Sequence, residues 1–308
     1  MTQDIRSSEV LNKAQAAHEI ERGSGVLVIL RRWLPGSYGR LTIHIVLIAL
    51  CVMILFPIVY TTLTSLRPQG FGLSRQILPT DGLYMGHYER LLSTPRFIRQ
   101  IANSGINSLG GAILTTLIAS MAGYAFARLR FAGRRYFLLF IMAMMMLPGI
   151  TNLIPLYRIA SDLGILNTYF VMIVVYGTYG IPFGIWIMKG FYETIPRVLE
   201  EAAAVDGANP VQTLVHVVVP MSMPGLVSVF MINFVFNWND FLTALVLLRS
   251  TAMKTATVGL FDYQNQLTGN NSELLAAAAI LIMIPGLIIF LIARRAFLQG
   301  MIEGAVKG

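Results

Sequence analysis

Charged side chains are scarce in this sequence. Only 12% of its 308 residues are Asp, Glu, Lys or Arg, whereas 56% are hydrophobic, and the mean hydropathy is +0.67. Soluble domains carry roughly 25% charged residues. The composition therefore excludes an ordinary soluble domain and predicts a chain embedded in a lipid bilayer.

Residues that usually carry chemistry are also few. The single cysteine, Cys51, excludes an internal disulfide framework and any multi-cysteine metal site. None of the four lysines stands in a GxxxxGK[ST] motif, so the sequence contains no P-loop. The four histidines form no HExxH motif, and no GxSxG motif is present. We therefore expect no catalytic residue, metal or cofactor in this chain, and ATP-driven work would need another polypeptide.

Six apolar runs reach the length of about 20 residues that spans a bilayer. These runs are Leu41–Leu63, Ile106–Ala127, Tyr136–Tyr157, Tyr169–Met188, Met223–Leu248 and Leu274–Ala293. They predict an all-α integral membrane protein with six transmembrane helices. Both termini then lie on the same side of the membrane.

Basic residues indicate which side that is. The termini and the second-to-third and fourth-to-fifth connections hold fifteen of the 23 Lys and Arg residues, and the other face holds eight. The positive-inside rule places the fifteen in the cytoplasm. The net charge of +8 is thus explained by orientation, and no nucleic acid partner is needed. The first outer loop, about 64–105, is the largest feature on the outer face. It either contacts an external partner or is a lid that closes the outer end of the membrane domain.

The boundaries of the apolar runs divide the chain into three segments. Residues 1–40 form a cytoplasmic N-terminal segment, partly amphipathic at 25–34. Residues 41–294 form the membrane domain, and residues 295–308 form a cytoplasmic tail.

A polar interruption, Leu199–Pro220, separates the fourth and fifth runs (LEEAAAVDGANPVQTLVHVVVP). Pro196 favours a helix start, Glu200 and Glu201 suit the first turns, and Ala202–Ala204 favour helix. Asp206-Gly207 is a stop signal, after which Asn209 can cap a second helix with Pro210 at its first position. We interpret this helix-turn-helix as a cytoplasmic knob presented to another protein. The alternative is an interfacial hairpin that binds nothing.

Polar residues also recur within the fifth run. Asn233, Asn237 and Asp240 follow i, i+4, i+7 spacing and would share one helical face, flanked by Trp238 and Asn239. Intramembrane polar groups often face a cavity, and amides, carboxylates and aromatic rings suit a sugar. Hydrogen bonding between helices explains them at least equally well. Asn152 and Tyr157 are further pathway candidates, with the same alternative.

Prolines and glycines interrupt the third and fourth runs. Pro148 and Gly149 lie in the third, and Gly180 and Pro182 in the fourth. They predict bends that permit movement, with simple packing as the alternative.

Several motifs carry a family resemblance. Those motifs are YAFARLRFAGRR (Tyr124–Arg135), NLIPLY (Asn152–Tyr157), LGILNT (Leu163–Thr168), IPFGIW (Ile181–Trp186), KGFYETIP (Lys189–Pro196) and NWNDF (Asn237–Phe241). With the EAA-type loop at Glu201–Gly207, they resemble the permease subunits of ATP-binding-cassette (ABC) importers of the carbohydrate-uptake class. The ending, LQGMIEGAVKG (Leu298–Gly308), resembles that of the smaller permease of the maltose importer.

The resemblance implies a type I ABC importer transmembrane domain in the bacterial inner membrane. Its partners would be a second, related permease, two ABC ATPase subunits that bind ATP and Mg, and an external solute-binding protein. It implies that the knob docks into an ATPase through Glu200, Glu201, Ala202, Ala203, Asp206, Gly207 and Pro220. It also implies that Gly304, Lys307 and Gly308 of the tail contact the ATPases.

We therefore expect a permease subunit that moves a sugar, oligosaccharide or sugar conjugate into the cytoplasm. One alternative is the same machine for a glycerol-phosphate-like solute. Another is a membrane scaffold that binds an ATPase without transporting.

Overall fold

The computed structural model describes residues 36–68, 82–266 and 272–305. Every regular element in these ranges is helical, which confirms the all-α prediction. The elements are α3 (Gly36–Ser65), α4 (Gly86–Leu92), α5 (Pro95–Arg128), α6 (Arg134–Met144), η1 (Gly149–Asn152), α7 (Leu153–Asp162), α8 (Tyr169–Tyr179), α9 (Ile181–Thr194), α10 (Arg197–Val205), α11 (Pro210–Thr213), η2 (Leu214–Val218), α12 (Val219–Met221), α13 (Met223–Asn239), α14 (Leu242–Leu247), α15 (Ala256–Gln266) and α16 (Ser272–Ala305). The amphipathic stretch at 25–34 lies outside the described residues.

Helix α3 contains the first membrane-length run. Its 25 residues Leu41–Ser65 are apolar and long enough to cross a bilayer. The chain divides into one compact unit that ends at Thr62 and a second that begins at Leu63, and the second contains the remaining helices.

In the described residues, three helices are long and apolar enough to span a bilayer, and three bent helix pairs could each supply one further span; the third pair includes knob helices that the predicted fifth run leaves out. Apolar stretches of α3, α5 and α16 are long enough to span. The pairs are α6 with η1 and α7, bent by 89°, α8 with α9, bent by 49°, and α11–α12 with α13, bent by 81°. The first two bends fall at Pro148-Gly149 and at Gly180-Ile181-Pro182, where proline and glycine predicted interruptions.

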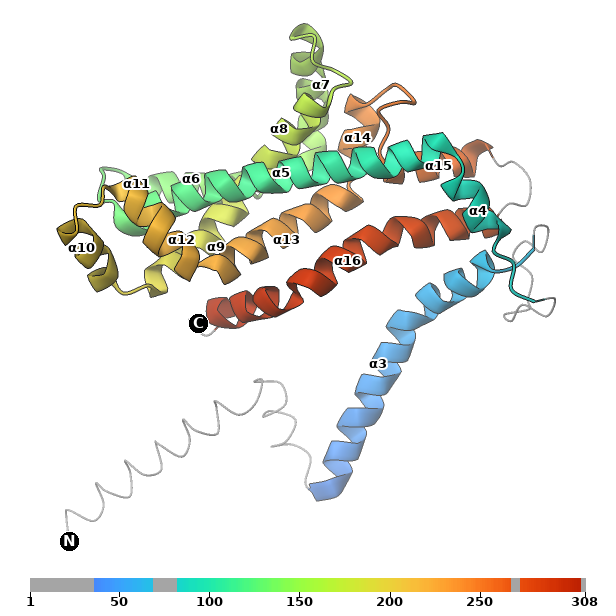
Figure 1. Ribbon diagram of the computed structural model, residues 1–308, viewed down its shortest axis with the longest axis horizontal. Coiled ribbons are helices and arrows are strands. Elements are labelled where there is room, and N and C mark those ends of the chain that lie inside the picture. Colours follow the sequence, from blue (N-terminus) through green and yellow to red (C-terminus); the bar gives the residue numbers. More distant parts are fainter. Residues whose placement is uncertain (1–35, 69–81, 267–271, 306–308) are drawn as a thin grey trace. The chain divides into compact units, whose positions relative to one another are not determined.

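Helix α5 lies at the centre of the second unit, and Figure 1 shows it running along α13. It packs on α8, α9 and α13. Its buried face consists largely of small side chains, among them Ser108, Ala112, Thr115, Ala119 and Gly123. Small residues let helix backbones approach closely in a membrane, where lipid removes the usual hydrophobic drive for helix association.

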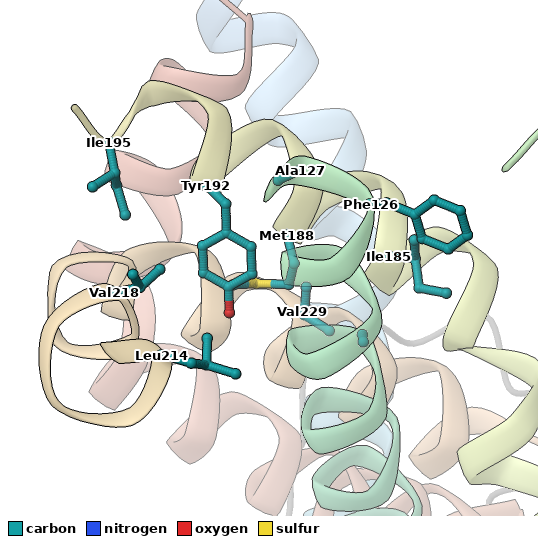
Figure 2. Packing of buried hydrophobic residues seen from close by; sticks show 10 residues of the cluster. Phe126, Ala127, Ile185, Met188, Tyr192, Ile195, Leu214, Val218 and Val229 are labelled. Carbon is teal, nitrogen blue, oxygen red and sulfur yellow. The ribbon is translucent and has the colours of Figure 1, made fainter. Parts of the chain in front are cut away.

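One end of the second unit carries the predicted knob, and the opposite end of α5 carries α4 and α15 (Figure 1). The core beside the knob joins α5, α9, η2 and α13. Figure 2 shows the ring of Tyr192 among Met188, Leu214 and Val218. Because Tyr192, Met188 and Val218 are fully buried, the knob rests on a packed core.

The predicted fifth span, Met223–Leu248, is wrong at its C-terminal end. Helix α13 stops at Asn239, Asp240 adopts an extended conformation (φ −65°, ψ 133°), and the separate helix α14 begins at Leu242. Asp240 breaks the run because its carboxylate accepts a hydrogen bond from the backbone N–H of Ala244, which favours the start of a new helix.

Candidate functional site

The first helix of the knob, α10, ends as the sequence predicts. Gly207 has φ +86°, a left-handed conformation that glycine adopts without strain. The N–H of Gly207 donates to Ala204 O (3.1 Å), and the N–H of Ala208 donates to Ala203 O (2.9 Å). These two bonds form a Schellman motif, which satisfies the last carbonyls of α10 and turns the chain sharply.

The second helix begins immediately afterwards, also as predicted. Asn209 Oδ1 accepts from the N–H of Gln212 and Gln212 Oε1 accepts from the N–H of Asn209, both at 2.9 Å. This capping box precedes Pro210 at the first helical position. The helix then widens into the π-helical turn η2, a rare form often found at functional positions.

The outward face of the knob combines charge with exposed apolar side chains. Glu201, Ala202, Asp206 and Gly207 are exposed, as is Pro220, whereas Ala203 is half-buried. Val205 is 88% exposed, and Val198 and Val211 are also exposed. These valines add exposed apolar surface to the charged face of the knob. Sequence reasoning missed Val205, although its place between the alanines and Asp206-Gly207 was a usable signal.

Glu200 differs from the other predicted coupling residues because it turns toward its own chain. Its side chain is 14% exposed and pairs with Arg128 at the end of α5. The structure therefore separates Glu200 from the outward face that holds Glu201.

The predicted polar stripe of the fifth run is largely buried within the chain. Asn233 Nδ2 donates to Val229 O of its own helix (2.8 Å), and Trp238 Nε1 donates to Ile282 O of α16 (3.1 Å). Asn237 lies against Gly111 of α5, and its Nδ2 is among the buried atoms that lack a hydrogen-bond partner in the described part of the chain. Of these three residues, Trp238 makes the hydrogen bond to another helix that the alternative predicts, whereas Asn233 bonds within α13 and Asn237 lies buried against α5.

Asp240 does not share a helical face with Asn233 and Asn237, because α13 ends before it. Its Oδ2 accepts from Tyr176 OH and from the N–H of Ala244, both at 3.0 Å, and its Oδ1 accepts from Thr243 Oγ1 (2.9 Å). The carboxylate thus joins α8 to the start of α14.

The remaining pathway candidates are more open. Asn239 is exposed, and its Nδ2 donates to Val235 O (2.8 Å). Asn152 is half-buried at the end of η1. Tyr157 of α7 lies under the Arg249 guanidinium, 4.9 Å from the ring centre. A cation over an aromatic face stabilises this arrangement without any solute.

We expect Asp240→Ala to lower the free energy of unfolding by about 1–3 kcal/mol, because three donors lose their acceptor. Thermal unfolding of the purified complex in detergent measures this change. Asp162→Ala, which removes an exposed carboxylate from the end of α7, is the matched control and should leave the midpoint unchanged. A loss of uptake without a loss of stability would instead return Asp240 to the solute pathway.

Within the described residues, no group of three or more His, Cys, Asp or Glu side chains is placed to hold a metal ion.

Residues 115–303 match the model of a family described as the binding-protein-dependent transport system inner membrane component. The chain belongs to this family. The match begins within α5 and ends within α16, and so includes the knob and its core.

Relatives of this permease span almost its whole length. It is 32% identical over 275 residues to the galactooligosaccharides transport system permease protein GanQ of Bacillus subtilis, covering 88% of this chain and 97% of the relative. It is 34% identical to the trehalose transport system permease protein SugB of Mycobacterium tuberculosis, covering 82% and 93%. The prediction of an ABC importer permease, a transport subunit and not an enzyme, is confirmed.

The permease also shares its fold with a chain of a bacterial ABC transporter involved in the import of the acidic polysaccharide alginate. The TM-score is 0.73 at 24% identity, covering 86% of this chain and 99% of that chain. The likeness confirms the predicted fold of an ABC importer transmembrane domain.

Proposed function

We propose that this permease moves a sugar or oligosaccharide into the cytoplasm with energy from ATP hydrolysed on partner subunits. The names of its relatives support the solute class. Besides galactooligosaccharides and trehalose, they include a diacetylchitobiose uptake permease of Streptomyces coelicolor, 31% identical over 273 residues. A glycerol-phosphate-like solute and a non-transporting scaffold have no comparable support.

The knob is the observation that carries the coupling part of the proposal. Its two helices are capped at the corner, rest on a packed core and present Glu201, Ala202 and Val205 outward. We propose that this face docks into an ABC ATPase subunit, which binds ATP and Mg, so that this chain itself needs no cofactor. Ala203, Asp206, Gly207 and Pro220 shape the face.

The proposal includes the orientation of the chain in the membrane and its partner subunits. The excess of basic residues supports a cytoplasmic position for the knob and both termini. A second, related permease completes the pathway, and an external solute-binding protein delivers the solute. Gly304, Lys307 and Gly308 would extend to the ATPases. Gly304 lies near the end of α16, whereas Lys307 and Gly308 lie outside the described residues.

Within the pathway, Asn239 is the amide that we propose faces the solute, because it is exposed. Asn233, Asn237 and Trp238 would support it from the packed side of α13, while Asn152 and Tyr157 would contribute from the third span.

Uptake by the assembled transporter in proteoliposomes tests the function. A solute-binding protein that binds the assembled transporter is added outside with radiolabelled trehalose, melibiose or a galactooligosaccharide, and glycerol 3-phosphate is the comparison. We expect ATP-dependent uptake of at least one sugar and none of glycerol 3-phosphate. Uptake of glycerol 3-phosphate alone would overturn the solute class. ATPase binding with no uptake of any of them would favour the scaffold.

A further inference from the structure

Glu200 and Arg128 form an ion pair between the knob and the central helix α5. Arg128 Nε lies 2.5 Å from Glu200 Oε1, and the two side chains are 8% and 14% exposed respectively. Tyr124, one turn earlier on α5, donates its hydroxyl to Glu200 Oε2 (3.0 Å). Both carboxylate oxygens are therefore occupied by one helix of the same chain, 72 or more residues earlier in sequence.

Arg128 also reaches the end of α9. Its Nη2 donates to Ile195 O (2.6 Å), a carbonyl at the C-terminal end of that helix. A cation is favoured at a helix C-terminus, and Glu200 is favoured in the first turn of α10. One guanidinium thus joins the end of α5, the end of α9 and the start of α10, with each charge at the helix end that suits it.

The link continues into the core beneath it. The rings of Tyr124 and Tyr192 meet edge to face, with centroids 5.9 Å apart. The Tyr192 hydroxyl lies 2.7 Å from Ser120 Oγ, and the ring is fully buried among the residues that Figure 2 shows. The ion pair is therefore anchored on rigid packing between α5 and α9.

Within the described residues, α10 has few other strong contacts with α5 and α9. Between the last residue of α9 and the first of α10 stand only Ile195 and Pro196, both extended. Beyond this junction, α10 packs mainly on α11 and η2, its own partners in the knob. Without the ion pair, an extended two-residue connection would let α10 tilt relative to α9.

We propose that Arg128, with Tyr124, is a positioning residue that clamps the docking helix α10 to α5 and α9 through Glu200. The rest of the knob docks on the ATPase, while Glu200 binds Arg128 of the same chain. Movement of the ATPase is thereby passed through this ion pair directly to the central helix α5. The inference depends on the proposed docking of the knob. It assigns Glu200 to transmission instead of ATPase contact.

The test compares Glu200→Gln, Arg128→Gln and the double variant in the assembled transporter in proteoliposomes. The amount of ATPase subunit that co-purifies with each variant measures docking. Coupling is measured as the number of ATP molecules hydrolysed per sugar molecule taken up, with a sugar that the wild type transports in the uptake experiment above. We expect docking to persist and the ATP consumed per sugar to rise about fivefold or more in each single variant, since site-to-site coupling is commonly of this size. The double variant should be no worse than either single variant, because both remove one interaction.

Two further variants separate the clamp from simple stability. Tyr124→Phe keeps the ion pair and should raise the same ratio less. Lys189→Gln removes a more exposed pair with Glu193, formed within α9, and should leave the ratio unchanged. An unchanged ratio in Glu200→Gln and Arg128→Gln overturns the clamp, and so does loss of ATPase binding in Glu200→Gln alone, which would make Glu200 a direct contact. Failure of the wild type to bind ATPase subunits would instead overturn the proposed function.

Discussion

We expect a Gly207→Pro variant to lose at least about nine tenths of its uptake, since a loss of ~1.4 kcal/mol in docking free energy already weakens binding tenfold. Proline fixes φ near −65°, whereas Gly207 has φ +86°. Proline also lacks the N–H that donates to Ala204 O. The corner between α10 and α11 would open, and the outward face would lose its shape. Uptake and binding-protein-stimulated ATP hydrolysis in proteoliposomes measure the loss.

Gly190→Ala is the matched control for that variant. Gly190 lies in α9 near the knob, and a Cβ there would meet no atom within 4 Å. Alanine also favours helix over glycine, so activity should be retained. Glu201→Lys provides a second test, because it reverses an exposed charge without altering the corner. Normal ATPase recruitment and stimulation in both Gly207→Pro and Glu201→Lys would rule out the docking role.

The second large effect is expected at the contact between α5 and α9. A Cβ at Gly123 would lie 2.7 Å from Met188 Cβ and 3.1 Å from the backbone nitrogen of Lys189. Neither neighbour is the end of a flexible side chain, so the two helices must move apart. Gly123→Ala should lower the free energy of unfolding by about 1–3 kcal/mol, as overpacking of a core commonly does.

The midpoint of thermal unfolding in detergent measures this effect. Gly105→Ala is the control on the same helix, because a Cβ at Gly105 would meet nothing within 4 Å. An equal midpoint for the two variants would show that α5 and α9 are not held at this separation.

Local signals in the sequence predicted the knob well. The helix stop at Gly207 and the helix start at Asn209 and Pro210 depend only on residues nearby in the sequence. Such signals can be recognised without knowledge of tertiary contacts. The bends at Pro148 and Gly180 were predictable for the same reason. The length of the apolar runs likewise indicated the membrane spans, because the thickness of the bilayer sets how many apolar residues a spanning helix needs.

Long-range contacts were not predictable from the sequence. Glu200 looked like one more acidic residue of the knob, and only the folding of α5 beside it brings Arg128 within reach. Asp240 looked like the next step of a helical stripe. Its hydrogen bonds to Tyr176 and Thr243 depend on where α8 and α14 lie, so periodicity alone extended the fifth run too far.

The doubly capped corner of the knob has a consequence for how fast and how tightly a partner associates. Because the Schellman motif and the capping box satisfy the backbone of both helix ends, the knob holds its shape without a partner. A preorganised surface loses little conformational entropy on association. The encounter should therefore resemble the meeting of two rigid bodies, with an association rate governed by collision and charge and not by folding of the segment.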